Sequence, residues 1–144
     1  MSEKHLMHTL RMPIRWGDMD AMGHVNNTVY FRYMEQARIE WFVELGAPAD
    51  ADLECGPVII NAHCAFLRQL RFPGDIEVTT HVSAIGRTSF ETVQEIRRTD
   101  TPDVIAATGG AKVVWIDYKR EKSVVIPDHL RERLVLHLQD PSGT

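Results

Sequence analysis

The segment from residue 17 to residue 27, GDMDAMGHVNN, gathers side chains that could do chemistry together. It holds two carboxylates, one imidazole and two amides, all placed just before an expected helix. A simple connection between two elements needs only one or two turn residues. The density of polar groups therefore indicates a functional site. Its candidate catalytic residues are Asp20, His24 and Asn27.

A calcium-binding loop is the first interpretation of this segment. Asp18 and Asp20 would be ligands one and three of such a loop, and Gly23 would stand at its sixth position. The same alignment places Met22 at the fifth position and Val29 at the twelfth, where a bidentate glutamate is needed. The pattern argues against a calcium loop.

A transition-metal site and an ordinary turn are two further interpretations. Asp18, Asp20 and His24 are ligand types that bind iron, manganese or zinc. His63 and His81 could complete such a site if the fold brought them close. Asp and Asn are also good turn and cap residues, so the segment could serve structure alone. Since no second ligand cluster stands out, no metal is predicted.

The fourth interpretation places a catalytic carboxylate beside a helix N-terminus. The first N–H groups of a helix have no partner within it and carry partial positive charge, which suits a developing oxyanion. Asp20 lies six or seven residues before the expected cap, Asn26 or Asn27, and could activate water or attack a carbonyl. Gly23 permits the bend that folds the acid back over the helix start. This interpretation accounts for the most residues.

The elements on either side of the segment have different periodicities. Residues 8–16 alternate between apolar and polar, which predicts a half-buried strand. Its apolar face is Leu10, Met12, Ile14 and Trp16. Within residues 28–45, apolar side chains recur at intervals of three and four residues, which predicts a long helix. Gly46 and Pro48 are expected to end it. Its apolar stripe is Tyr30, Tyr33, Met34, Ala37, Trp41, Phe42 and Leu45.

The rest of the chain predicts strands and turns. We expect strands at residues 57–67, 76–85, 89–98 and 104–117. Gly109 and Gly110 predict a bulge in the last of these strands. Asp128 is expected to cap a short amphipathic helix. The order predicts an α+β domain over residues 1–144, whose mostly antiparallel sheet wraps the long helix.

Composition excludes several classes of protein. The chain has 144 residues and a net charge of −4, which argues against a nucleic-acid partner. No apolar run approaches the ~20 residues of a membrane span, and the first residues lack the apolar stretch of a secretion signal. Cys55 and Cys64 form no CxxC pair and are expected to be reduced. These features predict a cytoplasmic protein.

Two stretches resemble a known family. Residues 15–38, RWGDMDAMGHVNNTVYFRYMEQAR, and residues 66–78, FLRQLRFPGDIEV, resemble the 4-hydroxybenzoyl-CoA thioesterase-like branch of the hotdog-fold thioesterases. The resemblance implies a hotdog fold, in which a five-stranded antiparallel sheet wraps one long central helix. It implies a homodimer or homotetramer with active sites at the subunit interface. It also implies hydrolysis of an acyl-CoA thioester with no cofactor.

The resemblance also suggests roles for individual residues. Asp20 matches the acid that acts as nucleophile or general base in such proteins. Asn27, with Asn26 or Thr28 within the error of the match, takes the position whose N–H binds the thioester oxygen. Apart from the resemblance, His24 is expected beside the site, where it could orient Asp20 or bond the backbone. The form of the motif here is closer to general and long-chain acyl-CoA members than to hydroxybenzoyl enzymes.

Further residues are assigned to substrate binding or to structure. Coenzyme A phosphates need basic groups at the mouth of a site, and two residues of the strand at 57–67 share one face. The predicted substrate-binding residues are Asn26, Tyr30, Asn61, His63, Arg68 and Arg87. Asp18 is expected to fix the loop through backbone N–H groups. Glu35, a second candidate acid on the long helix, is placed to pair with Arg38.

Three alternative functions stay open. The chain could hydrolyse acyl groups carried by acyl carrier protein, or it could bind acyl-CoA or lipid without reaction. A hydratase on the same fold is a third possibility, for which no compelling Asp/His pair is visible. The presence of Asp20, Gly23 and the cap asparagines favours an enzyme, because a binding module has no need of that carboxylate.

Overall fold

The computed structural model describes residues 7–48, 50 and 52–138. These residues form six strands, two α-helices and one short 3₁₀ helix, Trp16–Asp18. The strands are β1 (His8–Pro13), β2 (Cys55–Phe66), β3 (Asp75–Ile85), β4 (Ser89–Arg98), β5 (Ile105–Asp117) and β6 (Lys122–Ser123). The helices are α1 (Asn27–Glu44) and α2 (Asp128–Leu136).

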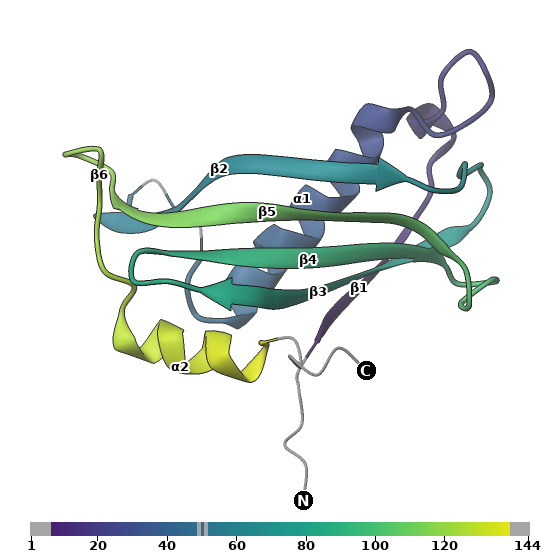
Figure 1. Cartoon of the computed structure of the whole chain (residues 1–144). Coiled ribbons are helices and arrows are strands. Elements are labelled where there is room, and N and C mark those ends of the chain that lie inside the picture. Colours follow the sequence, from purple (N-terminus) through teal and green to yellow (C-terminus); the bar gives the residue numbers. More distant parts are fainter. Residues whose placement is uncertain (1–6, 49, 51, 139–144) are drawn as a thin grey trace, which may run out of the picture.

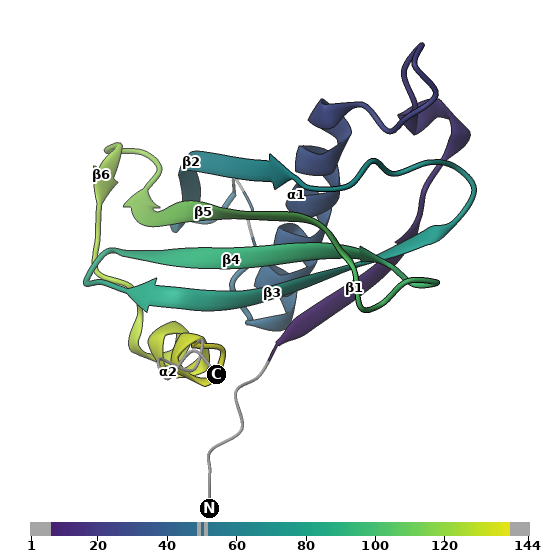
Figure 2. The ribbon, with the colours of Figure 1, turned by 45° about the vertical axis from the view of Figure 1, so that its right-hand side comes forward.

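The strands make one antiparallel sheet in the order β1-β3-β4-β5-β2, with β6 paired to β5. Figures 1 and 2 show α1 lying across one face of this sheet, while α2 lies at the edge beyond β3. The predicted α+β architecture, a sheet around a long helix, is therefore confirmed. The sheet leaves β1 and β2 as its two edges.

Two parts of the fold prediction need correction. The sheet has six strands rather than five, because Lys122 and Ser123 pair with Asp117 and Ile116 as β6. Two residues are too few to leave a periodic signal. The described residues also form two α-helices, whereas the expected fold has one long central helix; α2 is the short helix that the sequence near Asp128 indicates.

Helix α1 follows the sequence prediction closely. The Asn26 side chain caps its start by accepting a hydrogen bond from the Thr28 N–H at 2.9 Å. Gly46, with φ of 77°, lies just after its end in the left-handed conformation that glycine adopts without strain. The predicted apolar stripe is buried in full; it comprises Tyr30, Tyr33, Met34, Ala37, Trp41, Phe42 and Leu45.

Three local predictions were wrong. Trp16 is 73% exposed, because the chain leaves β1 after Pro13 and enters the 3₁₀ helix. Gly109 and Gly110 pair in register with both neighbouring strands and form no bulge. The cap of α2 is Pro127, and Asp128 is its first residue. The Trp16 error came from extending the alternation beyond the end of β1, and the other two came from residue types that serve several local structures.

The core divides into two clusters along α1. The first cluster includes Tyr30, Met34 and Leu70 and lies near the start of the helix. The second includes Trp41, Phe42 and Leu134, and it fills the space between the far end of α1, the sheet and α2. The long helix therefore contributes to both clusters, so it is fixed at both ends.

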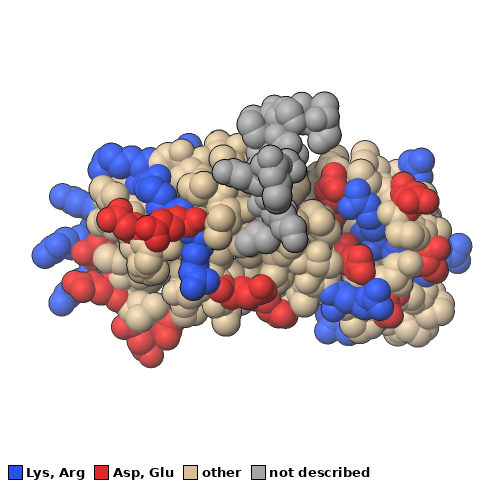
Figure 3. Space-filling model, turned by 90° about the horizontal axis from the view of Figure 1, so that it is seen from below, with Lys and Arg blue, Asp and Glu red and all other residues tan. Residues whose placement is uncertain are grey.

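The charged side chains and the helices can be compared with what the composition predicts. In the view of Figure 3, acidic and basic side chains are interspersed over the face shown, with no broad patch of one sign. None of the helices formed by residues 7–48, 50 and 52–138 is both long and apolar enough to cross a membrane.

Candidate active site

The loop before α1 is a tight hairpin. Met19 and Val25 form an antiparallel bridge that closes it. Inside the bridge, the Asp20 N–H donates to the His24 carbonyl at 2.9 Å, and the Gly23 N–H donates to the Asp20 carbonyl at 3.0 Å. Gly23 has φ of 77°, which other residues rarely adopt. The hairpin therefore folds back as predicted.

The Asp20 carboxylate is exposed and only partly engaged. Its Oδ1 accepts a hydrogen bond from the Met22 N–H at 2.9 Å. Within the described part of the chain, Oδ2 has no hydrogen-bond partner. One oxygen is thus fixed by the backbone, which orients the group, and the other is open to a water molecule or a substrate.

At the start of α1, the Asn27 backbone N–H is available as a donor. The Asn26 side chain takes the Thr28 N–H, and the Asn26 carbonyl takes the Val29 N–H at 2.9 Å. For the Asn27 N–H, the described residues offer no acceptor. Because the helix dipole places partial positive charge at this end, the Asn27 N–H suits an oxyanion.

A cleft of about 420 Å³ brings these groups together. It lies between the hairpin, the start of α1 and the chain that follows β2. Its lining residues are Asp20, Met22, His24, Val25, Asn27, Tyr30, Phe66, Leu67, Arg68 and Gln69. All three predicted catalytic residues and two of the predicted binding residues, Tyr30 and Arg68, are among them.

Tyr30 forms the back wall of the cleft. Its hydroxyl donates to the Arg68 carbonyl at 2.9 Å and accepts from the Leu70 N–H at 3.1 Å. Burial is the main cause that raises the pKa of Tyr30. Phe66 packs edge-on against the Tyr30 ring, with 5.1 Å between the ring centroids. Tyr30 is therefore part of the core and a support for the cleft at the same time.

Asp18 fixes the base of the hairpin. It is 6% exposed, and its Oδ2 accepts from the Tyr33 hydroxyl at 2.7 Å and from the Arg15 N–H at 2.9 Å. Burial and the Asp18 carboxylate both raise the pKa of Tyr33. The expectation that Asp18 holds the loop through a backbone N–H is confirmed.

Two predicted binding residues of β2 lie outside the cleft. A Cβ built on Gly110 would lie 3.1 Å from the His63 Nε2, whereas one built on Gly109 would lie 2.9 Å from the Met34 Sδ of α1. Since adjacent strand residues point to opposite faces, His63 lies on the sheet face away from α1. Asn61, two residues earlier, shares that face.

Arg87 and Asn26 also lie apart from the cleft lining. Arg87 is in the turn between β3 and β4, at the end of the sheet opposite the hairpin (Figure 1). Its carbonyl accepts from the Ile126 N–H and from Arg131, so it supports the start of α2. Asn26 uses its side chain as the helix cap.

The structure also bears on the metal-site interpretation and on Glu35, the second candidate acid. Across residues 7–48, 50 and 52–138, no three His, Cys, Asp or Glu side chains lie close enough to hold a metal ion. His63 and His81 lie on β2 and β3, with β5 and β4 between them.

Glu35 pairs with Arg32 at 3.5 Å rather than with Arg38. It lines a separate cleft of about 530 Å³ between β1 and α1.

The sequence reasoning missed five lining residues. They are Met22, Val25, Phe66, Leu67 and Gln69, and they complete the cleft. Residues 66–78 form the second stretch that resembles the family, and Arg68 is the one residue among them that the sequence assigns to the site. The signal that could have found the others is the end of the apolar strand expected at residues 57–67, where the stretch 66–78 begins. Side chains at the end of a strand line the space beside the loop that follows.

Comparison with known proteins gives the family. The thioesterase-like superfamily matches residues 14–134 of this chain. The chain therefore belongs to the thioesterase-like superfamily, and its sheet and helix are the hotdog fold of that superfamily.

Solved structures and curated relatives agree with this family. The PA2801 protein of Pseudomonas aeruginosa is 33% identical with a TM-score of 0.84, over 88% of this chain and 97% of that one. The BH1999 gentisyl-coenzyme A thioesterase is 25% identical with a TM-score of 0.77, over 88% and 98%.

The acyl-acyl carrier protein thioesterase ATL2 of Arabidopsis thaliana is 27% identical over 86% of this chain and 66% of its own length. The chain spans 54% of the length of one other curated relative and 94% of another. The 4-hydroxybenzoyl branch, named by the sequence resemblance, is not singled out by these matches.

Proposed function

We propose that this chain hydrolyses an acyl-CoA thioester to the free acid and coenzyme A. The observation that carries the proposal is the shared cleft, which is lined both by Asp20, with its open carboxylate oxygen, and by Asn27, with its free N–H. Thioester hydrolysis needs a nucleophile or base and a donor to the oxyanion, and these two groups are of those kinds. Family membership supports the reaction class.

In the proposed reaction, the thioester carbonyl oxygen accepts the Asn27 N–H. In the general-base route, Asp20 takes a proton from water while the hydroxide oxygen bonds to the acyl carbon, the C–S bond breaks, and the thiolate takes up that proton. In the nucleophilic route, an Asp20 oxygen bonds to the acyl carbon and the C–S bond breaks, which leaves an acyl-Asp20 anhydride and a thiolate. Water then hydrolyses the anhydride, which releases the free acid, restores the Asp20 carboxylate and supplies the proton for the thiolate. Because a thiolate leaves readily, the chain and one water molecule suffice, and no cofactor is proposed.

His24 and Arg68 have supporting roles in this proposal. The His24 carbonyl holds the Asp20 N–H at 2.9 Å, and His24 lines the cleft beside the acid. The exposed Arg68 donates to the Leu67 carbonyl at 2.9 Å at the cleft wall. Its guanidinium is the proposed contact for a phosphate of coenzyme A. Asn61, His63 and Arg87 have no contact with this cleft within one chain.

We further propose that two copies pair through β2. This strand is an edge of the sheet, so one side of its backbone is unpaired. Along it, Ile59, Ile60 and Phe66 are 36%, 55% and 44% exposed, and a second copy would cover these apolar side chains. Phe66 also lines the cleft, so the proposed interface would adjoin the active site. A homotetramer would require a further contact between two such dimers.

The test is thiol release from a panel of short, medium, long and aromatic acyl-CoA esters. Replacing Asp20 by Asn should lower kcat by about 100-fold or more, the usual contribution of a general base. Asp50→Asn is the matched control, because the Asp50 Oδ1 also accepts the N–H two residues later, at 2.9 Å, away from the cleft. The control should keep wild-type kcat.

Other outcomes would change the proposal. Near wild-type kcat in Asp20→Asn would remove Asp20 from the mechanism. Release from an acyl carrier protein ester but from no CoA ester would favour the alternative carrier, which the ATL2 likeness also raises. Saturable acyl-CoA binding without thiol release would favour a binding module.

A further inference from the structure

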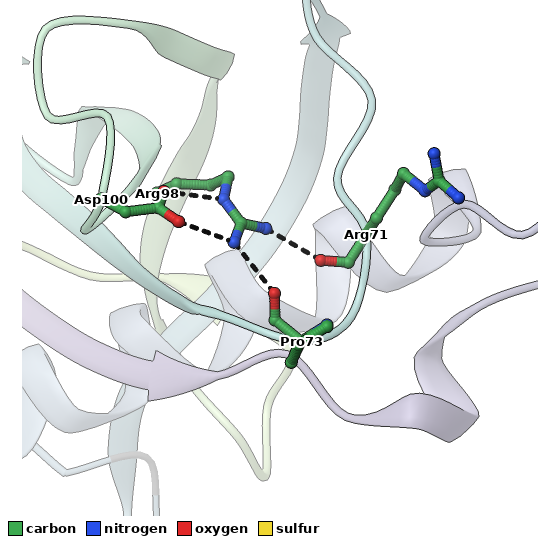
Figure 4. Close-up of polar contacts among 4 residues, drawn as sticks. All are labelled: Arg71, Pro73, Arg98 and Asp100. Atoms are coloured by element: carbon green, nitrogen blue, oxygen red, sulfur yellow. Dashed lines mark hydrogen bonds and ion pairs between the residues drawn. The ribbon is translucent and has the colours of Figure 1, made fainter.

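Arg98, at the end of β4, clamps a loop that it does not belong to. Its Nη1 donates to the Arg71 carbonyl at 2.8 Å, and its Nη2 donates to the Pro73 carbonyl at 2.9 Å. Asp100 holds the other side of the guanidinium through contacts of 2.8 and 3.0 Å. Figure 4 shows the guanidinium directed at both carbonyls, while the Arg71 side chain points away.

The loop between β2 and β3 is built around this clamp. A Cβ on Gly74 would lie 2.7 Å from the Arg98 Cζ, so only glycine leaves room for the guanidinium at that point. Gly74 also has φ of 148°, which L side chains rarely adopt. The opposite half of the loop has its own anchor, because the Tyr30 hydroxyl bonds Arg68 and Leu70.

The clamped loop is bonded directly to the candidate site. The Leu70 carbonyl accepts the Val25 N–H at 2.8 Å, and Val25 closes the hairpin through its bridge to Met19. The Gly74 carbonyl accepts the Ile14 N–H at 2.8 Å, just before the 3₁₀ helix. Both chain segments that enter and leave the hairpin region therefore rest on this loop.

We infer that Arg98 is a positioning residue for the active site, acting through the Arg71–Gly74 backbone and the Leu70–Val25 hydrogen bond. It touches no substrate; it fixes where Asp20 and the Asn27 N–H stand. An isolated surface ion pair is worth little, but a guanidinium with three oriented acceptors fixes geometry as well as charge. The link to catalysis rests on the proposed function, whereas the clamp itself does not.

The experiment combines amide hydrogen exchange with steady-state kinetics. In Arg98→Gln we expect the Val25 amide to exchange at least tenfold faster, while amides in the centre of β4 and β5 keep wild-type rates. We expect kcat to fall about tenfold or more with a smaller change in KM, because misplaced groups lose transition-state contacts. Arg97→Gln is the matched control, since Arg97 is a partly buried arginine of the same strand that pairs with Glu95 at 2.9 Å.

Arg98→Lys separates geometry from charge. Lysine keeps the charge but cannot reproduce the planar fork, so it should behave like Arg98→Gln. Rescue by lysine, or an unchanged Val25 amide in Arg98→Gln, would overturn the inference. If the wild type hydrolyses no ester, the proposed function fails, yet the exchange rate of Val25 still decides whether the clamp exists.

Discussion

Asp18 and Asp20 lie two residues apart in environments that give them different roles. Asp18 is buried; its Oδ2 accepts from the Tyr33 hydroxyl and the Arg15 N–H, and its Oδ1 lies 3.4 Å from the Arg15 guanidinium. Asp20 is exposed and receives only the Met22 N–H. A carboxylate surrounded by donors is held in place, whereas one with an open oxygen can act on water. The D-x-D pattern shows both acids, but only the three-dimensional structure shows their partners.

Replacement of Tyr33 by Phe tests the structural half of this pair. The variant loses the hydrogen bond to the buried Asp18 carboxylate, which should lower the free energy of unfolding by about 1–3 kcal/mol. Urea denaturation at neutral pH measures this loss. Asp20 keeps its own backbone contact, so kcat with any accepted ester should change less than in Asp20→Asn. Unchanged stability would show that Asp18 does not depend on Tyr33.

The same variant should change the dependence of stability on alkaline pH. The pKa of Tyr33 is raised in the folded chain, while an unfolded tyrosine titrates near pH 10. Below that pH the stabilising contribution is complete. Above it, the unfolded chain loses a proton that the folded chain retains, so the free energy of unfolding falls as pH rises. The fall should be less steep in Tyr33→Phe; equal slopes in both proteins would contradict the assignment.

At the scale of elements, periodicity was a good guide to α1 and a poor one to exact sheet geometry. The apolar stripe and the Asn26 and Gly46 ends of α1 follow from spacing and residue type. Alternation correctly placed Asn61 and His63 on one shared face. It could not say which face, because a period of two is the same for both. That choice depends on how the neighbouring strand and helix pack.

Gly109 is the position at which the sequence predicts a bulge and the structure shows a close approach of α1 instead. A glycine in a strand indicates either a bulge or a close approach, and here α1 approaches. An added Cβ would lie 2.5 Å from the His63 carbonyl and 2.9 Å from the Met34 side chain. Gly109→Ala should therefore lower the free energy of unfolding by about 1–3 kcal/mol in urea.

Gly17→Ala is the control for that substitution. Nothing lies within 4 Å of a Cβ built at Gly17, and α1 does not press on it. We expect a neutral or slightly stabilising effect there, because alanine reduces the freedom of the unfolded chain. If both variants lost equal stability, the close approach of α1 to β5 would not be the reason for Gly109.

At the scale of the whole molecule, the exposed β2 edge predicts self-association. Ile60→Lys places a charge on this edge and should shift the proposed dimer toward monomer in sedimentation velocity runs. Ile60 is already 55% exposed, so the fold of a single chain should lose little. Val135→Lys, at 52% exposure on α2, is the matched control and should leave the assembly unchanged. A wild type that is monomeric at all concentrations would contradict the proposed pairing.

The division of the core into two clusters has a consequence for how this chain can be altered. Val25 and Tyr30 of the first cluster line the cleft, whereas no described member of the second cluster does. Well-separated sites contribute nearly independently to stability. Residues around Trp41 and Leu134 could therefore be repacked to raise heat tolerance while the choice of substrate stays as it is. Laboratory evolution of the two properties could proceed in separate halves of one small domain.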